Sequence, residues 1–240
     1  MGPKSKIPWT EASWNPVTGC TPISAGCLHC YAQAILHRWK RSQKIELHPS
    51  RLAEPIRWKR PRKVFVCSMS DLFHEKVPLS FIVDVYKTIS ATPRHTYQIL
   101  TKRPERMCDI WTYPFPLSNV WYGVTVENQA ERWRIAHLRS IPWAPGAIRF
   151  LSCEPLLGPL DLHLVKGGIQ WVIVGGENGP CARPMEQEWV IDIRDQCVSA
   201  GVPFFFKGWG RGNHHREIEG QRWEQMPAQT PAIGAGVVSG

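Results

Sequence analysis

Short runs of apolar, β-branched or aromatic residues recur along the chain. They cover residues 64–69, 96–100, 120–126, 148–152, 169–174 and 202–206. Runs of this length that are apolar at nearly every position are typical of strands buried on both faces, as in parallel sheets. The pattern therefore predicts a sheet that is covered on both sides.

Segments with the apolar spacing of helices lie between several of these runs. The candidate helices cover residues 80–91, 104–111, 128–140 and 186–200. In the first of them Phe81, Val85 and Ile89 lie four residues apart on one face, and Gly201 stands where the last can end. Residues 155–168 are too rich in Pro and Gly for a full helix.

Strand–helix alternation of this kind predicts right-handed βαβ units and a parallel sheet. The fold class expected is α/β, and about six or seven units favour a partial or full (β/α) barrel over an open doubly wound sheet. We expect one domain over residues 1–224 and a poorly ordered tail over residues 225–240.

Three cysteines lie close together near the N-terminus, in the segment 14–31: Cys20, Cys27 and Cys30. Three thiolates on one loop can hold three corners of a [4Fe–4S] cube and leave the fourth iron free to bind a small molecule. S-adenosylmethionine (SAM) needs such an iron, because its amino and carboxylate groups chelate it before electron transfer cleaves the sulfonium. The loop therefore predicts a cluster that serves SAM chemistry.

A zinc site is the alternative for this loop. The C-x2-C pair is common to zinc and iron–sulfur loops, and His29 or His37 could complete a Cys3His set. Against zinc, the cysteines open a large α/β domain that needs no metal to fold, and no second C-x2-C pair exists. The other five cysteines are scattered singly, as small buried residues are: Cys67, Cys108, Cys153, Cys181 and Cys197.

Composition restricts the environment and the partners. No apolar stretch has the length of a membrane span and the start lacks the apolar segment of a signal peptide, so we expect a cytoplasmic protein, in which disulfides are disfavoured. The formal charge is +9, and residues 57–63 hold five basic side chains around Trp58, with more over residues 38–44. Such a tract suits phosphate contact and base stacking, although it also suits a solvated connector.

Polar residues and glycines follow the predicted strands where they end. In parallel α/β folds the functional groups gather at the carboxyl ends of the strands. A merely structural barrel needs no such collection of charged groups at one rim, so we expect a cofactor site there. Its predicted members are Ser68, Ser70, Asp71, Lys102, Thr125, Glu127, Ser152, Glu154, Gly175 and Gly176.

The cysteine loop and these strand ends together resemble a known family. The segments that carry the resemblance are residues 9–20, 68–74, 100–106, 150–158 and 172–177. They resemble the three-Cys-motif proteins of phage and bacterial genomes, which are of unknown function and are grouped with the radical SAM superfamily. The resemblance covers roughly residues 7–210 and implies a partial β/α barrel with the cluster loop at its mouth. It implies no substrate.

The chain departs from the superfamily in the spacing of its cysteines. Most members have C-x3-C-x2-C with an aromatic residue before the last cysteine, whereas here the first gap is six residues and His29 precedes Cys30. The superfamily's Gly-Gly-Glu-like segment, which binds the amino group of the cofactor, follows the second strand. Here the literal Gly-Gly-Glu follows the sixth run, at residues 175–177.

The resemblance also assigns roles by strand order. Ser68, Ser70 and Asp71 would meet the methionyl end of SAM, and Gly175 and Gly176 would allow close backbone approach near the adenine or the substrate.

Chemistry adds further assignments. Thr125 and Glu127 are candidates for the ribose hydroxyls, since a carboxylate accepts hydroxyl hydrogens well. Lys102 and Arg103 could pair with the carboxylate of SAM or with a substrate phosphate.

These observations predict a radical SAM enzyme that generates a 5′-deoxyadenosyl radical to abstract a substrate hydrogen. A nucleotide or nucleic-acid base to be modified or repaired is the favoured substrate. An electron donor such as flavodoxin or ferredoxin would reduce the cluster. The alternatives are a zinc-stabilised nucleic-acid-binding module without catalysis, or a radical enzyme whose rim residues Glu154, Glu177 and Lys207 recognise a small metabolite or a peptide.

Overall fold

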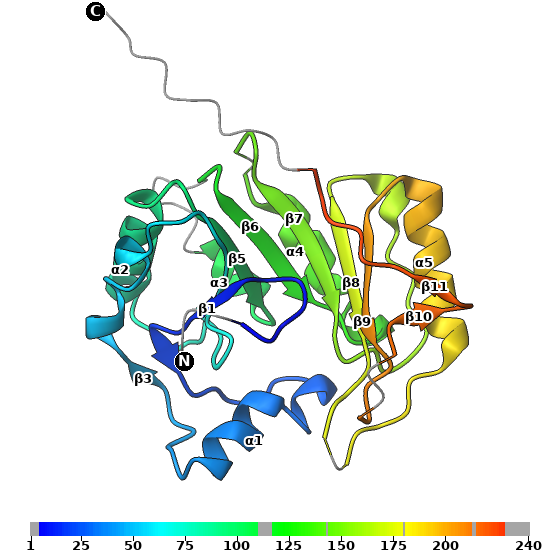
Figure 1. Ribbon diagram of the computed structural model, residues 1–240, viewed down its shortest axis with the longest axis horizontal. Helices are drawn as coiled ribbons and strands as arrows, with labels where there is room; N and C mark the ends of the chain where they lie inside the picture. The colour runs from blue at the N-terminus through cyan, green and yellow to red at the C-terminus, as the bar shows by residue number, and fades with distance from the viewer. Residues whose placement is uncertain (1–4, 110–116, 143, 180, 213–214, 229–240) are drawn as a thin grey trace, which may run out of the picture.

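A curled sheet of parallel strands forms the centre of the computed structural model, which describes residues 5–109, 117–142, 144–179, 181–212 and 215–228. Its seven strands are ordered β1-β4-β5-β6-β7-β8-β9. They are β1 (Ala12–Trp14), β4 (Lys63–Val66), β5 (Thr96–Thr101), β6 (Val120–Thr125), β7 (Ile148–Cys153), β8 (Trp171–Gly175) and β9 (Phe204–Gly208). The sheet curves into an open half-barrel (Figure 1), which confirms the predicted partial barrel.

Five α-helices accompany the sheet in the described part of the chain. They are α1 (Tyr31–Arg38), α2 (Leu79–Ser90), α3 (Pro104–Asp109), α4 (Trp133–Ser140) and α5 (Gln187–Ala200). Helices α2 to α5 pack on the outer face of the sheet, whereas α1 follows the cysteine loop and lies below the half-barrel in Figure 1. The helix predicted over residues 128–140 is shorter than expected, because a 3-10 turn at Gln129–Glu131 precedes α4. Residues 110–111 of another predicted helix lie outside the described residues.

The remaining elements are short. They are the strands β2 (Val17–Thr18), β3 (Glu46–Leu47), β10 (Glu217–Ile218) and β11 (Gln221–Arg222), and the 3-10 turns η1 (Ala25–Cys27), η2 (Pro49–Arg51), η3 (Pro55–Arg57), η4 (Gln129–Glu131) and η5 (Leu164–Lys166). Strand β1 is a seventh strand that the apolar pattern did not reveal, since three residues are too few for a pattern. Strand β4 ends at Val66, earlier than the apolar run, because Cys67 adopts a left-handed conformation with φ of 59°.

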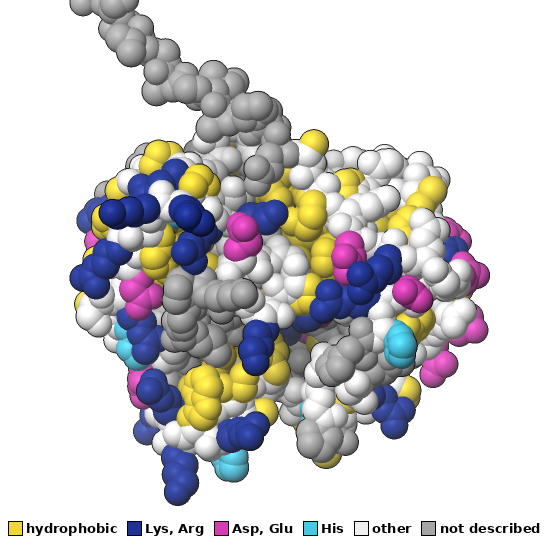
Figure 2. All heavy atoms as spheres, in the orientation of Figure 1, with side chains coloured by type: hydrophobic (Ala, Val, Ile, Leu, Met, Phe, Trp, Pro, Cys, Tyr) yellow, Lys and Arg dark blue, Asp and Glu magenta, His cyan; other side chains and the backbone are white. Residues whose placement is uncertain are grey.

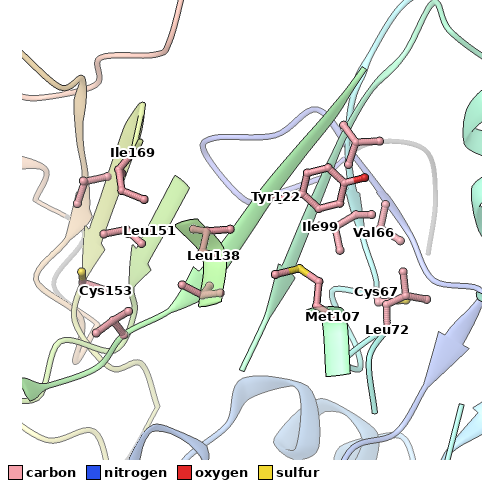
Figure 3. Packing of buried hydrophobic residues seen from close by; sticks show 14 of the residues in the cluster. Val66, Cys67, Leu72, Ile99, Met107, Tyr122, Leu138, Leu151, Cys153 and Ile169 are labelled. Atoms are coloured by element: carbon pink, nitrogen blue, oxygen red, sulfur yellow. The ribbon is translucent and has the colours of Figure 1, made fainter. Parts of the chain in front are cut away.

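The main hydrophobic core lies between the outer face of the sheet and its helices. Alternate strand residues such as Val66, Ile99 and Leu151 point to this side. They pack with Met107 of α3 and Leu138 of α4 (Figure 3). This layer accounts for one of the two buried faces that the apolar runs predict.

Aromatic side chains fill much of the inner face. Phe65, Phe150, Trp171 and Phe205 point inward and form a second buried cluster with Trp9 of the N-terminal segment. The rings of Trp9 and Phe65 have centroids 4.8 Å apart. Aromatic packing therefore fills the concave side along the middle of the strands.

The C-terminal part of the described chain runs along β9 and the inner cluster. The Phe204 amide donates to the Gln225 side chain at 2.9 Å, and the Trp171 indole donates to the Gln225 carbonyl at 2.9 Å. Ordered chain thus continues past the boundary predicted at residue 224, while residues 229–240 of the predicted tail lie outside the described residues. In the part of the chain that is described, no helix is long and apolar enough to cross a bilayer.

Candidate functional site

A cavity of about 270 Å³ lies at the carboxyl ends of the strands, beside the cysteine loop. The predicted site residues that line it are Cys27, Cys30, Lys102, Thr125, Ser152, Glu154 and Gly176. The fold thus brings two cysteines of the loop together with side chains that follow β5, β6 and β7. Cys20, Ser68, Ser70, Asp71, Glu127 and Gly175 are not among its lining residues.

The strand pleat explains why the cavity has an apolar floor and a polar wall. Ser152 lies two residues beyond the inward Phe150, so both side chains project from the same face of β7. Thr125 is the register partner of Ser152 on β6. Phe65 and Trp9 therefore form the apolar floor, and Thr125 and Ser152 place their hydroxyl groups in the wall above it.

Each of the three cysteines has a different environment. Cys27 is buried, and its sulfur lies 3.7 Å from Ser24 Oγ. Cys30 immediately precedes α1. Cys20 lies near the end of β5, where Arg103 Nη1 donates to its sulfur at 3.7 Å. Burial raises the pKa of the Cys20 thiol to about 11, although the Arg103 charge acts in the opposite direction.

This donor set fits a [4Fe–4S] cube. The thiolates of a cube bind different irons, so they need not converge on one point. Within the described segments no three His, Cys, Asp or Glu side chains are grouped closely enough to hold one metal ion. Cys27 and Cys30 also border the cavity, where a molecule bound to a fourth iron would have to lie.

The end of β5 holds the first part of the cysteine loop through Arg103. This guanidinium donates to the Thr21 carbonyl and to Thr21 Oγ1, both at 3.0 Å. Asp71 lies 3.4 Å from Arg103 and also accepts hydrogen bonds from Thr101 Oγ1 at 2.8 Å and from the Lys102 amide at 3.0 Å. The Asp71 carboxylate is therefore engaged within the protein and supports the loop indirectly.

The two predicted serines near Asp71 also have protein partners. Ser68 Oγ donates to Asn15 Oδ1 at 3.2 Å, and Ser70 Oγ donates to the Val17 carbonyl at 3.0 Å. In addition, Tyr31 of α1 donates to the Ser68 carbonyl at 2.6 Å. These contacts join the end of β4 to the chain on either side of the cysteines.

Glu127, at the end of β6, holds the middle of the loop. Its fully buried carboxylate accepts a hydrogen bond from Ser24 Oγ at 2.6 Å and pairs with Lys102 at 3.1 Å and Arg134 at 2.7 Å. Burial by itself raises the pKa of Glu127, but Lys102 and Arg134 outweigh it and hold the pKa below its ordinary value. A Cβ atom on Gly26 would lie 2.5 Å from this carboxylate, which explains the glycine.

The segment after β8 holds the same loop from a third direction. Glu177 accepts hydrogen bonds at 2.9 Å from the backbone and from Nε of Arg183. The Arg183 guanidinium in turn donates to the Ala25 carbonyl at 2.9 Å. Burial is the largest single influence and raises the pKa of Glu177, but the hydrogen bonds and charge of Arg183, with a smaller effect of His29, together hold the pKa below its ordinary value. We call the contacts made by Arg103, Glu127 and Arg183 the loop clamp.

The two predicted glycines lie close to other parts of the protein. A Cβ on Gly176 would be 2.0 Å from the Trp209 carbonyl oxygen, and one on Gly175 would be 2.8 Å from Glu154 Oε1. Both glycines thus allow the turn after β8 to pack against its neighbours. Gly176 also borders the cavity.

Several cavity residues were not among the predicted cofactor contacts. His29 and Tyr31 flank Cys30 in the sequence, so their closeness to a cysteine could have indicated them. Trp9, which lines the cavity, and Arg183, which contacts the cysteine loop, carry no such signal. They reach the site only through the path of the N-terminal segment and of the loop after β8. Glu177 and Lys207, which the alternative with a metabolite or peptide substrate predicts as recognition residues, do line the cavity.

A half-barrel of parallel strands with a three-cysteine loop and a cavity at its carboxyl ends defines a protein with a radical SAM-like fold. The chain belongs to DUF5131, a family described as protein of unknown function, which matches it over residues 4–227. No curated protein matches the chain.

Solved structures of spore photoproduct lyase have the same fold. A double mutant with bound AdoMet and dinucleoside spore photoproduct has a TM-score of 0.53 at 13% identity, over 80% of this chain and 62% of that chain. A complex with dinucleoside spore photoproduct has a TM-score of 0.51 at 13% identity, with the same coverage of 80% and 62%. A cysteine-to-serine mutant has a TM-score of 0.50 at 14% identity, over 83% and 64%. The chain thus spans less than two thirds of these proteins.

Proposed function

We propose that this protein is a radical SAM enzyme in which Cys20, Cys27 and Cys30 bind a [4Fe–4S] cluster. The observation that supports this most strongly is the loop clamp. It holds a three-cysteine loop across the carboxyl ends of a parallel half-barrel. Two of the cysteines border a cavity that aromatic side chains line from below. The cluster, with SAM on its fourth iron, would supply reductive cleavage of the sulfonium and the 5′-deoxyadenosyl radical.

The cavity wall supplies the groups that would bind SAM. Lys102 carries a positive charge that suits the cofactor's carboxylate, although it also pairs with Glu127. Thr125 and Ser152 offer hydroxyl groups for the ribose, although Ser152 Oγ also donates to Glu154 at 3.3 Å. Asp71, Ser68 and Ser70 already have protein partners, so we assign them to positioning of the loop and place the cofactor contacts on the residues of the cavity.

The aromatic floor has a separate role. Trp9 and Phe65 belong to the buried aromatic cluster on the concave side of the sheet and also line the cavity. A reactive carbon radical abstracts hydrogen from whatever lies next to it, so a dry and rigid pocket favours reaction at the intended substrate.

A nucleotide or a nucleic-acid base is the substrate we favour. Two of the structures with the same fold contain a dinucleoside photoproduct, and this chain has a net charge of +9. The basic tract at residues 57–63 leads into the amino end of β4, at the edge of the sheet opposite the cavity. It therefore suits a distant contact with a long polyanion better than contact with the reacting group.

The predicted electron donor, a flavodoxin or ferredoxin, belongs to the same proposal. So does a cytoplasmic location, which suits eight cysteines that form no disulfide in this structure. The relation to phage proteins stays a prediction from the sequence motifs. A small metabolite or a peptide is the alternative substrate, bound by the rim groups Glu154, Glu177 and Lys207.

Anaerobic reconstitution with iron and sulfide tests the enzyme class. We expect about four irons per chain and release of 5′-deoxyadenosine when SAM and a reductant are added. Cys30→Ala should abolish the release, whereas Cys181→Ala, which removes an exposed thiol outside the loop, should retain it. Stoichiometric zinc without SAM cleavage would refute the proposal and favour the zinc-stabilised module.

A further inference from the structure

A second, more basic pocket of about 210 Å³ adjoins the cavity near the ends of β8 and β9. The two share Gly176, Asn178 and Lys207 as lining residues. The other residues that matter for its charge are Lys6, from the N-terminal segment, and Arg216, which precedes β10. Figure 2 shows Lys and Arg side chains gathered over the β8–β9 region on this face of the molecule.

Every charged residue that lines this pocket is a cation. Lys207 pairs with Glu154 at 3.1 Å, and Arg216 lies 3.4 Å from Glu224 with both side chains about one third exposed. Exposed pairs of this kind are weak. Within the described part of the chain Lys6 has no carboxylate partner. The three cations of the pocket therefore outnumber the two carboxylates, Glu154 and Glu224, that pair with them.

Glycines form much of the remaining wall: Gly175, Gly176, Gly208 and Gly210. Gly210 has a φ of +77°, which favours glycine, and a Cβ there would lie 2.2 Å from the Glu177 carbonyl oxygen. The glycines let the turns after β8 and β9 pack closely together, so this part of the pocket wall is backbone, and the three cations supply the side-chain charge of the lining. The amide of Asn178 adds a neutral donor.

We infer that this pocket binds a phosphoryl group of the substrate, while the part of the substrate to be changed lies in the adjoining cavity. Several cations around one small space suit a group with several anionic oxygens. The carboxylate of SAM is the wrong occupant, since it would have to reach an iron beside Cys27 and Cys30, and neither cysteine lines this pocket. Lys207 borders both spaces and would contact the substrate where they join.

This inference rests on the proposed function for the role of the cavity, but its test does not need the cluster. Binding to the protein without cluster or SAM is measured by calorimetry, with deoxynucleosides, their 5′-monophosphates and short single-stranded oligonucleotides as probes. We expect the wild-type protein to bind the phosphorylated probes about tenfold or more tightly than the nucleosides, as charge-assisted hydrogen bonds do.

The discriminating variant combines Lys6→Gln and Arg216→Gln. It should lose the preference for phosphorylated probes and leave nucleoside binding unchanged, since neither residue lines the cavity. Arg222→Gln is the matched control, because Arg222 is an exposed cation of the neighbouring strand β11 that does not line the pocket. Should the double variant unfold, Lys6→Gln alone serves, since Lys6 has no ion pair to lose among the described residues. This single variant should reduce the preference severalfold.

The outcomes separate the possible sources of the phosphate and the two proposals. Tighter binding of oligonucleotides than of monophosphates would identify a nucleic-acid chain, and equal binding would identify a free nucleotide; either result supports the pocket. Equal affinity of wild-type protein for nucleosides and monophosphates, or a preference that survives in the double variant, would overturn the inference. Failure to release 5′-deoxyadenosine together with an intact phosphate preference would reject the proposed function alone.

Discussion

Replacement of Glu127 by Gln tests whether this carboxylate holds the cysteine loop or contacts the cofactor. The wild-type carboxylate is fully buried and joins Ser24 of the loop to Lys102 and Arg134. Glutamine has nearly the same shape, but it carries no charge, and one of its two oxygens becomes an NH2 group. That group cannot accept the hydrogen bonds that now end on the carboxylate.

The cost can be estimated from the burial of the partners. Removal of one partner of a buried ion pair costs about 3–5 kcal/mol, because the other charge stays buried without compensation. Arg134 would still donate to the Thr125 carbonyl at 2.9 Å and pair with Glu131 at 2.7 Å, so the lower end of that range applies. For a protein of this size, about 3 kcal/mol lowers the unfolding temperature by about 6–12 °C.

Two measurements on the protein without cluster report the effect. Thermal unfolding gives the loss of stability, and mass spectrometry gives the alkylation rate of each cysteine. We expect Glu127→Gln to unfold at lower temperature and its Cys27, which is buried in the wild type, to react faster. Glu131→Gln is the matched control, because Glu131 pairs with Arg134 but makes no contact with the loop. It should leave the alkylation of Cys27 unchanged.

One result would refute this reasoning. If Glu127→Gln unfolds at the wild-type temperature and its thiols react at wild-type rates, while the reconstituted protein binds SAM more weakly, Glu127 contacts the ribose as the sequence predicts. The loop clamp would then be unnecessary at this position.

Substitutions at Asp71, Gly176 and His95 test three other parts of the structure. Asp71→Asn should lower the iron bound on reconstitution, because Asp71 holds Arg103 against the loop; full iron content with weaker SAM binding would contradict this. Gly176→Ala should destabilise the protein by about 1–3 kcal/mol in urea unfolding, since its Cβ would lie 2.0 Å from the Trp209 carbonyl, and unchanged stability would show that the turn can move. His95 is buried, and burial lowers its pKa below 6.5, so the stability from its neutral form is present above that pH and is lost as the pH falls. The unfolding temperature should therefore drop on acidification, and by less in His95→Gln.

The spacing of apolar residues along the chain was sufficient to predict the longer strands and most of the helices. Residues 120–126 and 148–152 are mostly apolar because the aromatic cluster and the helices cover both faces of β6 and β7. Helix α5 ends at Ala200, as Gly201 in the left-handed conformation requires. Such features depend on neighbours in the chain, which is why the parallel half-barrel could be predicted.

The sequence predicts where the polar residues at the strand ends lie, but it does not predict which role each of them has. Parallel strands bring their carboxyl ends to one edge, so residues after them were certain to lie near one another once the sheet was predicted. Whether a carboxylate there faces the cavity or the loop depends on how the loop crosses that edge. Glu127 faces Ser24, which lies 103 positions away in the chain, and no local pattern encodes that contact.

By itself the sequence determined the order of strands and helices and the three thiols on one loop, because periodicity and spacing arise from backbone geometry. Only the tertiary structure decided that Arg103, Glu127 and Arg183 hold that loop. It also decided that Lys6 and Arg216, from opposite ends of the chain, border one pocket. The physical reason is that a charged side chain takes the partner that lies within hydrogen-bond distance, and long-range packing alone sets which partner that is.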